Sequence, residues 1–129
     1  MRLLLDSNVA LPIVRKEREM LGAHVNLLLS TGSNDIFVSI ASLWEIAIKA
    51  RLGRLPLGMP VRQLPITLTE FGYTLLAVDH HHAIEDLIDQ PDTGDPFDRM
   101  LLAQCQVEGM RLVTADRALQ RHSLVWRPA

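Results

Sequence analysis

The sequence predicts an α/β fold, a three-layer α/β/α sandwich built around a mostly parallel central sheet of four or five strands. Short apolar segments with β-branched or aromatic residues alternate along the chain with longer segments of helical periodicity. The short segments are almost continuously apolar, which is typical of parallel strands covered on both faces. We therefore expect helices on both sides of the sheet.

Length and composition predict a single domain over residues 1–129. A chain of 129 residues can bury its own core, and 48% hydrophobic with 22% charged residues exclude a disordered chain. Cys105 is the only cysteine, which excludes internal disulfides and cysteine-based zinc sites. The apolar run at residues 3–5 stops at Asp6, and no apolar stretch reaches the length of a membrane span. We expect a cytoplasmic protein.

The first half of the chain contains two predicted strands, at residues 2–5 and 36–39. A helix that Ser7 or Asn8 would cap follows the first strand, and a second helix is predicted over residues 17–30, before Gly32. Residues 41–52 predict a helix that ends at Gly53 and buries one apolar face, with Trp44 also in the core. Three prolines leave the structure of residues 55–72 open.

The second half repeats the alternation. Residues 74–78 predict a third buried strand, and Asp79 would cap a helix that continues through Ile88. After a loop, Asp95 and Pro96 begin a helix that ends at Gly109. Residues 111–114 predict a fourth strand, and residues 123–126 are a candidate fifth.

The net charge of −2 excludes a protein that coats nucleic acid through bulk positive charge, although not an enzyme that acts on it locally. The charge is unevenly distributed, with eight Lys or Arg against five acids in residues 1–62. Several of these cations flank the acidic residues considered next, and they are candidate phosphate contacts or ordinary surface charges: Arg15, Lys49, Arg51 and Arg54.

Four acids occupy places where surface charge is not expected, and each has a structural alternative. Asp6 and Asp116 follow the first and fourth strands, where each could cap the next helix. Glu45 interrupts an apolar helix, where it could form a capping box with Ser42 or pair with Lys49. Asp98 lies in a first helical turn, where the helix dipole favours a carboxylate.

Taken together, the four acids predict a metal site. The carboxyl ends of parallel strands meet at one edge of a sheet, which is where ligands bind in such folds. Two carboxylates about 4 Å apart repel by ~4 kcal/mol at an effective dielectric near 20, so a cluster requires cations. Oxygen ligands without Cys or His favour Mg²⁺ or Mn²⁺, which activate water for phosphodiester hydrolysis.

Four segments resemble the acidic motifs of PIN-domain ribonucleases, and in particular the VapC-type toxins of bacterial toxin-antitoxin modules. These segments are LLLDSNV, FVSIASLWEIAIKARLGRL, DPFDRMLLAQCQVEGM and LVTADRAL, in that order between Leu3 and Leu119. The resemblance implies a PIN-like sandwich in which Asp6, Glu45 and Asp98 are the core acids and Asp116 is a more variable fourth. Thr114 matches a small hydroxyl residue that steadies the site.

The resemblance also implies Mg²⁺- or Mn²⁺-dependent cleavage of RNA to 3′-hydroxyl and 5′-phosphate ends. It implies a homodimer, and inhibition by a cognate antitoxin whose tail enters the active-site groove. Ser7, Asn8, Asp95 and Arg99 are candidate supporting residues. Ser7 and Asn8 depart from the Thr and His of many relatives, and Pro65 weakens a helix that the resemblance leads us to expect.

Two alternatives stay open at this point: a PIN-like nuclease that acts on DNA or a small phosphoester, and a non-catalytic module that binds RNA or protein. The other candidate features favour neither. Three consecutive histidines, 80–82, point apart on a helix and predict a solvated helix start, while Cys105 predicts inert packing. Phosphate-binding glycine loops and the serine hydrolase motif are absent.

Overall fold

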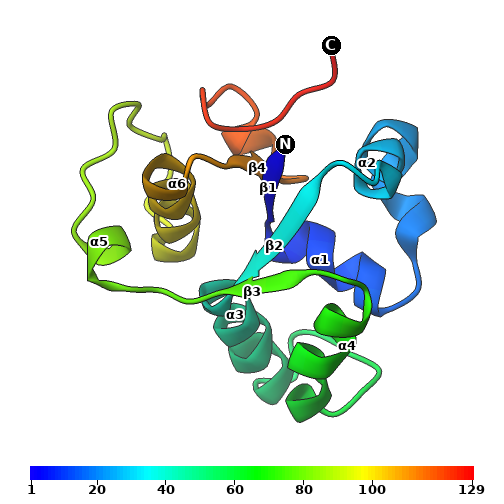
Figure 1. Ribbon diagram of the computed structural model, residues 1–129. Helices are drawn as coiled ribbons and strands as arrows, with labels where there is room; N and C mark the ends of the chain where they lie inside the picture. Colours follow the sequence, from blue (N-terminus) through cyan, green and yellow to red (C-terminus); the bar gives the residue numbers. More distant parts are fainter.

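The structure is a computed structural model that describes residues 1–129. Its centre is a sheet of four strands, all parallel, in the order β3-β2-β1-β4 (Figure 1). The strands are β1 (Arg2–Leu5), β2 (Asp35–Ser39), β3 (Thr74–Leu76) and β4 (Arg111–Val113). Helical segments connect successive strands, so the predicted parallel α/β architecture is confirmed.

Helices cover both faces of this sheet. Figure 1 shows α6 (Pro96–Glu108) on one side and α1 (Ser7–Val14), α2 (Gly22–Ser30) and α4 (Leu64–Glu70) on the other. Helix α3 (Ile40–Arg51) continues from the end of β2 and contacts both α1 and α6. The three layers are therefore helix, sheet and helix, and α3 joins the outer layers beyond the carboxyl ends of the strands.

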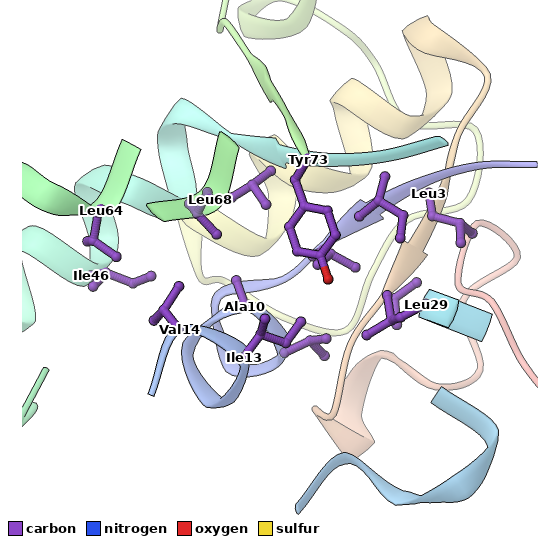
Figure 2. Packing of buried hydrophobic residues seen from close by; sticks show 14 of the residues in the cluster. Leu3, Ala10, Ile13, Val14, Leu29, Ile46, Leu64, Leu68 and Tyr73 are labelled. Carbon is purple, nitrogen blue, oxygen red and sulfur yellow. The ribbon is translucent and has the colours of Figure 1, made fainter. Parts of the chain in front are cut away.

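Two hydrophobic cores lie on opposite faces of the sheet because successive strand side chains alternate in direction. Leu3 and Leu5 of β1 belong to the larger core, whereas Leu4 belongs to the smaller core under α6. Figure 2 shows the larger core, where residues of α1, α2 and α4 surround Tyr73. Full burial of one such leucine contributes about 2 kcal/mol. No helix is long and apolar enough to cross a membrane.

Side chains at the strand ends begin the helices that follow. Asp6 caps α1, as its structural alternative proposed, because its carboxylate accepts from the Ser7 backbone N–H at 2.7 Å; the prediction of Ser7 or Asn8 as the cap was wrong. Asp95 caps α6 as predicted, and Gly109 ends that helix with a φ of 69°. The predicted helix over 17–30 divides at Gly22 into a 3₁₀ turn, Arg18–Leu21, and α2.

The segment after α3, whose structure the sequence left open, contains a helix. Within residues 55–72 the chain forms a short 3₁₀ turn, Val61–Gln63, and then α4, which tolerates Pro65 in its first turn. Strand β3 is shorter than predicted and only half-buried, because it lies at the edge of the sheet.

The helix that Asp79 caps, α5 (His80–Ala83), ends five residues before Ile88. The prediction of a longer amphipathic helix was wrong, since Ile84 and Ile88 are 77% and 90% exposed. The three histidines do not share one environment: His80 and His81 are exposed as predicted, but His82 is buried. Its Nδ1 accepts a hydrogen bond from the Asp79 backbone N–H, which closes a capping box and turns the ring inward.

Two further predictions require correction. Trp44 is 63% exposed and not in the core, because this side of α3 is left uncovered: Ile40, one turn earlier on the helix, is also exposed, at 40%. The Trp44 ring packs edge-on against Phe97, with 5.7 Å between the ring centroids. The candidate fifth strand is reduced to a single parallel bridge between Val125 and Leu112, so the sheet has four strands.

Candidate active site

The carboxyl ends of β1 and β4 bring the first site residues together. These two strands pair in parallel, with Leu5 opposite Val113, so Asp6 and Thr114 emerge side by side. The Thr114 hydroxyl donates a hydrogen bond of 2.7 Å to Asp6 Oδ2. Topology therefore joins residues that are more than one hundred positions apart in the sequence.

Asp6 is almost completely buried, with 3% of its surface exposed, and protein donors fix both carboxylate oxygens. Oδ1 accepts from the Ser7 backbone N–H, and Oδ2 accepts from Thr114. Burial raises the pKa of Asp6, and the negative charges of Glu45 and Asp116 raise it further. The two hydrogen bonds lower the pKa, but by less than these effects raise it. The carboxylate is thus rigidly oriented in a place that disfavours its negative charge.

Asp98 enters the site from the first turn of α6. Burial, followed by the negative charges of Asp95, Asp6 and Asp116, raises its pKa to about 6. The Thr93 hydroxyl donates to Asp98 Oδ2 at 3.3 Å and accepts from the Asp95 backbone N–H. Sequence reasoning missed Thr93, although a hydroxyl residue just before an Asp-Pro helix start is a signal for such a turn.

Glu45 lies inside α3, and its side chain is 9% exposed. The Ser7 hydroxyl donates to Oε1 at 2.7 Å, and Lys49 Nζ donates to Oε2 at 3.0 Å. The pairing with Lys49 is one of the two structural alternatives given above. The other alternative, a capping box with Ser42, does not form: Ser39 caps α3, and the buried Ser42 hydroxyl has no hydrogen-bond partner.

Asp116 combines a capping role with a place near the other acids. Its side chain caps the 3₁₀ turn Arg117–Leu119, and its backbone N–H donates to the Thr114 hydroxyl at 3.1 Å. Asn8 supports the same strand end, because its Oδ1 accepts from the Ala115 backbone N–H at 3.0 Å. The charge of Asp116 raises the pKa values of both Asp6 and Asp98, which places it in the same acidic cluster.

The remaining candidate residues lie around this cluster. Asp95 caps α6 through the Phe97 backbone N–H at 2.8 Å. Arg99 is exposed and forms a long hydrogen bond of 3.5 Å to Gln90 Oε1, and no ion pair with Asp95. Among the candidate phosphate contacts, Arg15 pairs with Glu17 at 3.3 Å, Lys49 pairs with Glu45, and Arg51 and Arg54 are exposed at the end of α3.

The donor set of the acidic cluster fits a hard divalent cation that keeps part of its water shell. All donors are oxygens, and the mutual repulsion of Asp6, Asp98 and Asp116 favours a positive ion. No group of three or more His, Cys, Asp or Glu side chains is arranged to hold a metal by itself. Mg²⁺ does not require such a cage, because one or two carboxylates and several waters commonly hold it.

The match to known families identifies the fold. The PIN domain family matches residues 3–123, which is nearly the whole chain. The chain belongs to the PIN-domain family. In this PIN domain the buried Asp6 lies at the edge where β1 and β4 end, and the buried Glu45 of α3 is joined to it through Ser7.

Individual relatives agree with this assignment. The PIN domain is 31% identical over 90 residues to Ribonuclease VapC22 of Mycobacterium tuberculosis. That alignment covers 70% of this chain and 69% of the relative. The PIN domain is 46% identical over 50 residues to Ribonuclease VapC16 of the same organism, over 38% of this chain and about a third (36%) of that relative. The chain is thus a VapC-type PIN domain.

A solved structure shows the same fold at low sequence similarity. This structure is described as VapBC2 from Rickettsia felis bound to a DNA fragment from their promoter. The TM-score is 0.59 at 16% identity, and the alignment covers 97% of this chain and 96% of that one. At this identity, the similarity supports the fold alone.

Proposed function

We propose that this chain is a metal-dependent endoribonuclease and the toxin of a toxin-antitoxin module. The observation that carries the proposal is the cluster of Asp6, Asp98 and Asp116, in which the charge of Asp116 raises the pKa of both Asp6 and Asp98 and the charge of Asp6 raises that of Asp98. A site that only binds RNA or protein would be more stable without this repulsion. The ribonuclease names of the two relatives support the same reaction.

Asp6 and Asp98 would hold Mg²⁺ or Mn²⁺, with Glu45 and Asp116 completing the acidic site. A cation bound there would supply charge stabilisation at the scissile phosphate and would favour ionisation of the attacking water. Thr114 and the Ser7 backbone N–H keep the Asp6 carboxylate in one orientation, which such chemistry requires. Asp98 must lose its proton before it can bind a cation, so its elevated pKa links activity to pH.

The proposed partners follow from the relatives. The structural neighbour is described as VapBC2 bound to promoter DNA, and the sequence motifs resemble those of toxin-antitoxin modules, so we propose a cognate antitoxin, with homodimers as the unit that it binds. Residues 1–129 would act as one domain, because both hydrophobic cores share the same sheet. Arg51 and Arg54, exposed at the end of α3, and the exposed Arg99 are the free candidates to contact RNA phosphates, whereas the other two candidates, Lys49 and Arg15, are paired with Glu45 and Glu17.

The proposal is tested by incubating the purified chain with a labelled RNA and with a single-stranded DNA of the same sequence. We expect cleavage of RNA in Mg²⁺ or Mn²⁺, loss of cleavage in EDTA, and little or no cleavage of DNA. The Asp6→Asn and Asp98→Asn variants should each lose at least about 100-fold of the rate, because each removes a charged ligand.

A matched control is Asp92→Asn, which removes an exposed carboxylate from the loop just before α6. This variant should cleave RNA at the unchanged rate. Equal cleavage by wild type, Asp6→Asn and Asp98→Asn would contradict the catalytic assignment. Preferential cleavage of DNA would favour the alternative nuclease, and cation-independent binding of RNA without cleavage would favour the non-catalytic module.

A further inference from the structure

Lys49 is the one cation that is hydrogen-bonded to the acidic site. It lies one helical turn after Glu45 on α3, and its Nζ is 3.0 Å from Glu45 Oε2. The other Glu45 oxygen accepts from the Ser7 hydroxyl at 2.7 Å, and Ser7 also donates its backbone N–H to Asp6. A continuous chain of hydrogen bonds therefore runs from Lys49 through Glu45 and Ser7 to Asp6.

An ordinary surface ion pair does not describe this contact. Exposed pairs four residues apart on a helix contribute little because water solvates both partners. Here the two partners differ: the Lys49 side chain is 50% exposed, whereas the Glu45 side chain is only 9% exposed. Without Lys49, Glu45 would keep a nearly buried negative charge whose only remaining donor is the Ser7 hydroxyl.

We propose that Lys49 is a positioning residue that binds Glu45 as an internal counter-ion, so that Glu45 orients Ser7 and Asp6 and does not ligate the cation directly. This inference rests on the proposed function for the cation itself. It changes the role of two residues: Glu45 acts through Ser7, and Lys49 is engaged by the protein before any RNA binds. Both oxygens of Glu45 are occupied by protein donors, as this role requires.

The charge of Lys49 should also weaken cation binding at Asp6 and Asp98. A positive charge near the site opposes a second one, and Glu45 cannot offer Oε2 to an ion while Lys49 occupies it. Lys49→Met removes the charge and keeps most of the side-chain stem. We expect this variant to bind Mn²⁺ about tenfold more tightly than wild type, measured without RNA as free Mn²⁺ by electron paramagnetic resonance.

The same variant should cleave RNA more slowly despite tighter Mn²⁺ binding, because Glu45 is no longer held at Oε2 and therefore orients Ser7 less firmly. Lys49→Arg keeps the charge and should retain wild-type Mn²⁺ affinity within about twofold. Arg62→Met removes an equal charge from an exposed residue outside the site and should leave Mn²⁺ affinity unchanged. An unchanged or weaker Mn²⁺ affinity in Lys49→Met, with Arg62→Met like wild type, would overturn the inference.

A metal-free measurement separates this inference from the proposed function. We expect Lys49→Met to lower the Tm in EDTA, and the added change Glu45→Gln to restore it, because the unpaired buried charge is then gone. Additive effects of the two changes would overturn the role of Lys49 even if the protein is a metal-dependent ribonuclease. Conversely, Glu45→Gln could restore the Tm of Lys49→Met as expected while the wild type binds no Mn²⁺. That result would contradict the proposed function and leave the Lys49–Glu45 pairing supported.

Discussion

Asp89 and Asp98 belong to the same acidic stretch of sequence, yet their surroundings shift their pKa values in opposite directions. Seven acids and no Lys or Arg lie between Asp79 and Asp98. Asp89 is 42% exposed and accepts from the Ser123 backbone N–H at 2.9 Å; this hydrogen bond, with a smaller effect from His122, lowers its pKa. Burial and three neighbouring acids raise the pKa of Asp98 to about 6.

The opposite pKa shifts show that ionised Asp89 stabilises the folded protein, whereas ionised Asp98 destabilises it. Asp89 joins the loop before α6 to the C-terminal segment, and its backbone carbonyl also contacts His122 Nε2 at 2.6 Å. Asp98 is held where its ionised form is unfavourable, which is the pattern expected of a functional carboxylate. Substitutions of Asp98 and Asp89 test this division directly, and substitutions of Thr114 test the hydrogen bond that holds Asp6 in the same acidic cluster.

The largest effect on stability is expected from Thr114→Val. The buried Thr114 hydroxyl donates to Asp6 and accepts from the Asp116 backbone N–H, so the valine leaves both groups without this partner. We expect a loss of about 2 kcal/mol in the free energy of unfolding, and a further rise in the pKa of Asp6. Urea denaturation at pH 7 measures the loss, and RNA cleavage should fall with it.

Thr114→Ser is the matched variant, since it keeps the hydroxyl and removes only a methyl group. It should retain most of the stability and of the cleavage rate. If Thr114→Ser were as damaged as Thr114→Val, then packing of the methyl group, and not the hydrogen bond to Asp6, would explain the effect.

The next effect is a gain in stability from Asp98→Asn in the absence of metal. The pKa of Asp98 is raised from 3.8 to about 6, so its contribution to stability is complete below pH 3.8 and is lost as pH rises through 6. Above pH 6 the variant should be more stable than wild type by about 1 kcal/mol, allowing for solvent screening of this partly exposed group.

Thermal unfolding in EDTA from pH 4 to pH 8 measures this difference. The two proteins should converge near pH 4, where wild-type Asp98 is largely protonated. A difference that is constant with pH would show that the ionised Asp98 carboxylate is not the cause. Added Mn²⁺ should reverse the order at pH 8, because it stabilises the wild type preferentially.

The smallest effect is expected from Asp89→Asn, with the opposite sign. The pKa of Asp89 is lowered, so its contribution is present above pH 3.8 and is lost as pH falls through its folded value. Asparagine keeps an acceptor for Ser123 but not the charge, so the Tm should fall by about 1–2 °C at pH 7, and the difference from wild type should shrink as the pH falls below 3.8. RNA cleavage should be unaffected, and a large loss of cleavage would place Asp89 in the site.

Much of the fold follows from local patterns that the sequence displays directly. Continuous apolar segments identified the strands, and Asp95 with Pro96 and Gly109 bounded α6 as predicted. The errors fall where local pattern and tertiary environment disagree. Ile84 and Ile88 have helical spacing but are exposed, and Trp44 lies on an apolar helix but faces open solvent beyond the sheet.

The acidic stretch shows the limit of the sequence most clearly. The sequence alone determined the parallel sheet and placed Asp6 and Asp116 after its strands, and from this it predicted that the four acids lie near one edge, because parallel strands place their carboxyl ends together. Only the tertiary structure decided that the ionised form of Asp98 is disfavoured and that of Asp89 is favoured. It also decided that Glu45 accepts hydrogen bonds from Ser7 and Lys49. The physical reason is that burial, like charges and hydrogen-bond donors within a few ångströms set the energy of a carboxylate, and these neighbours come from distant parts of the chain.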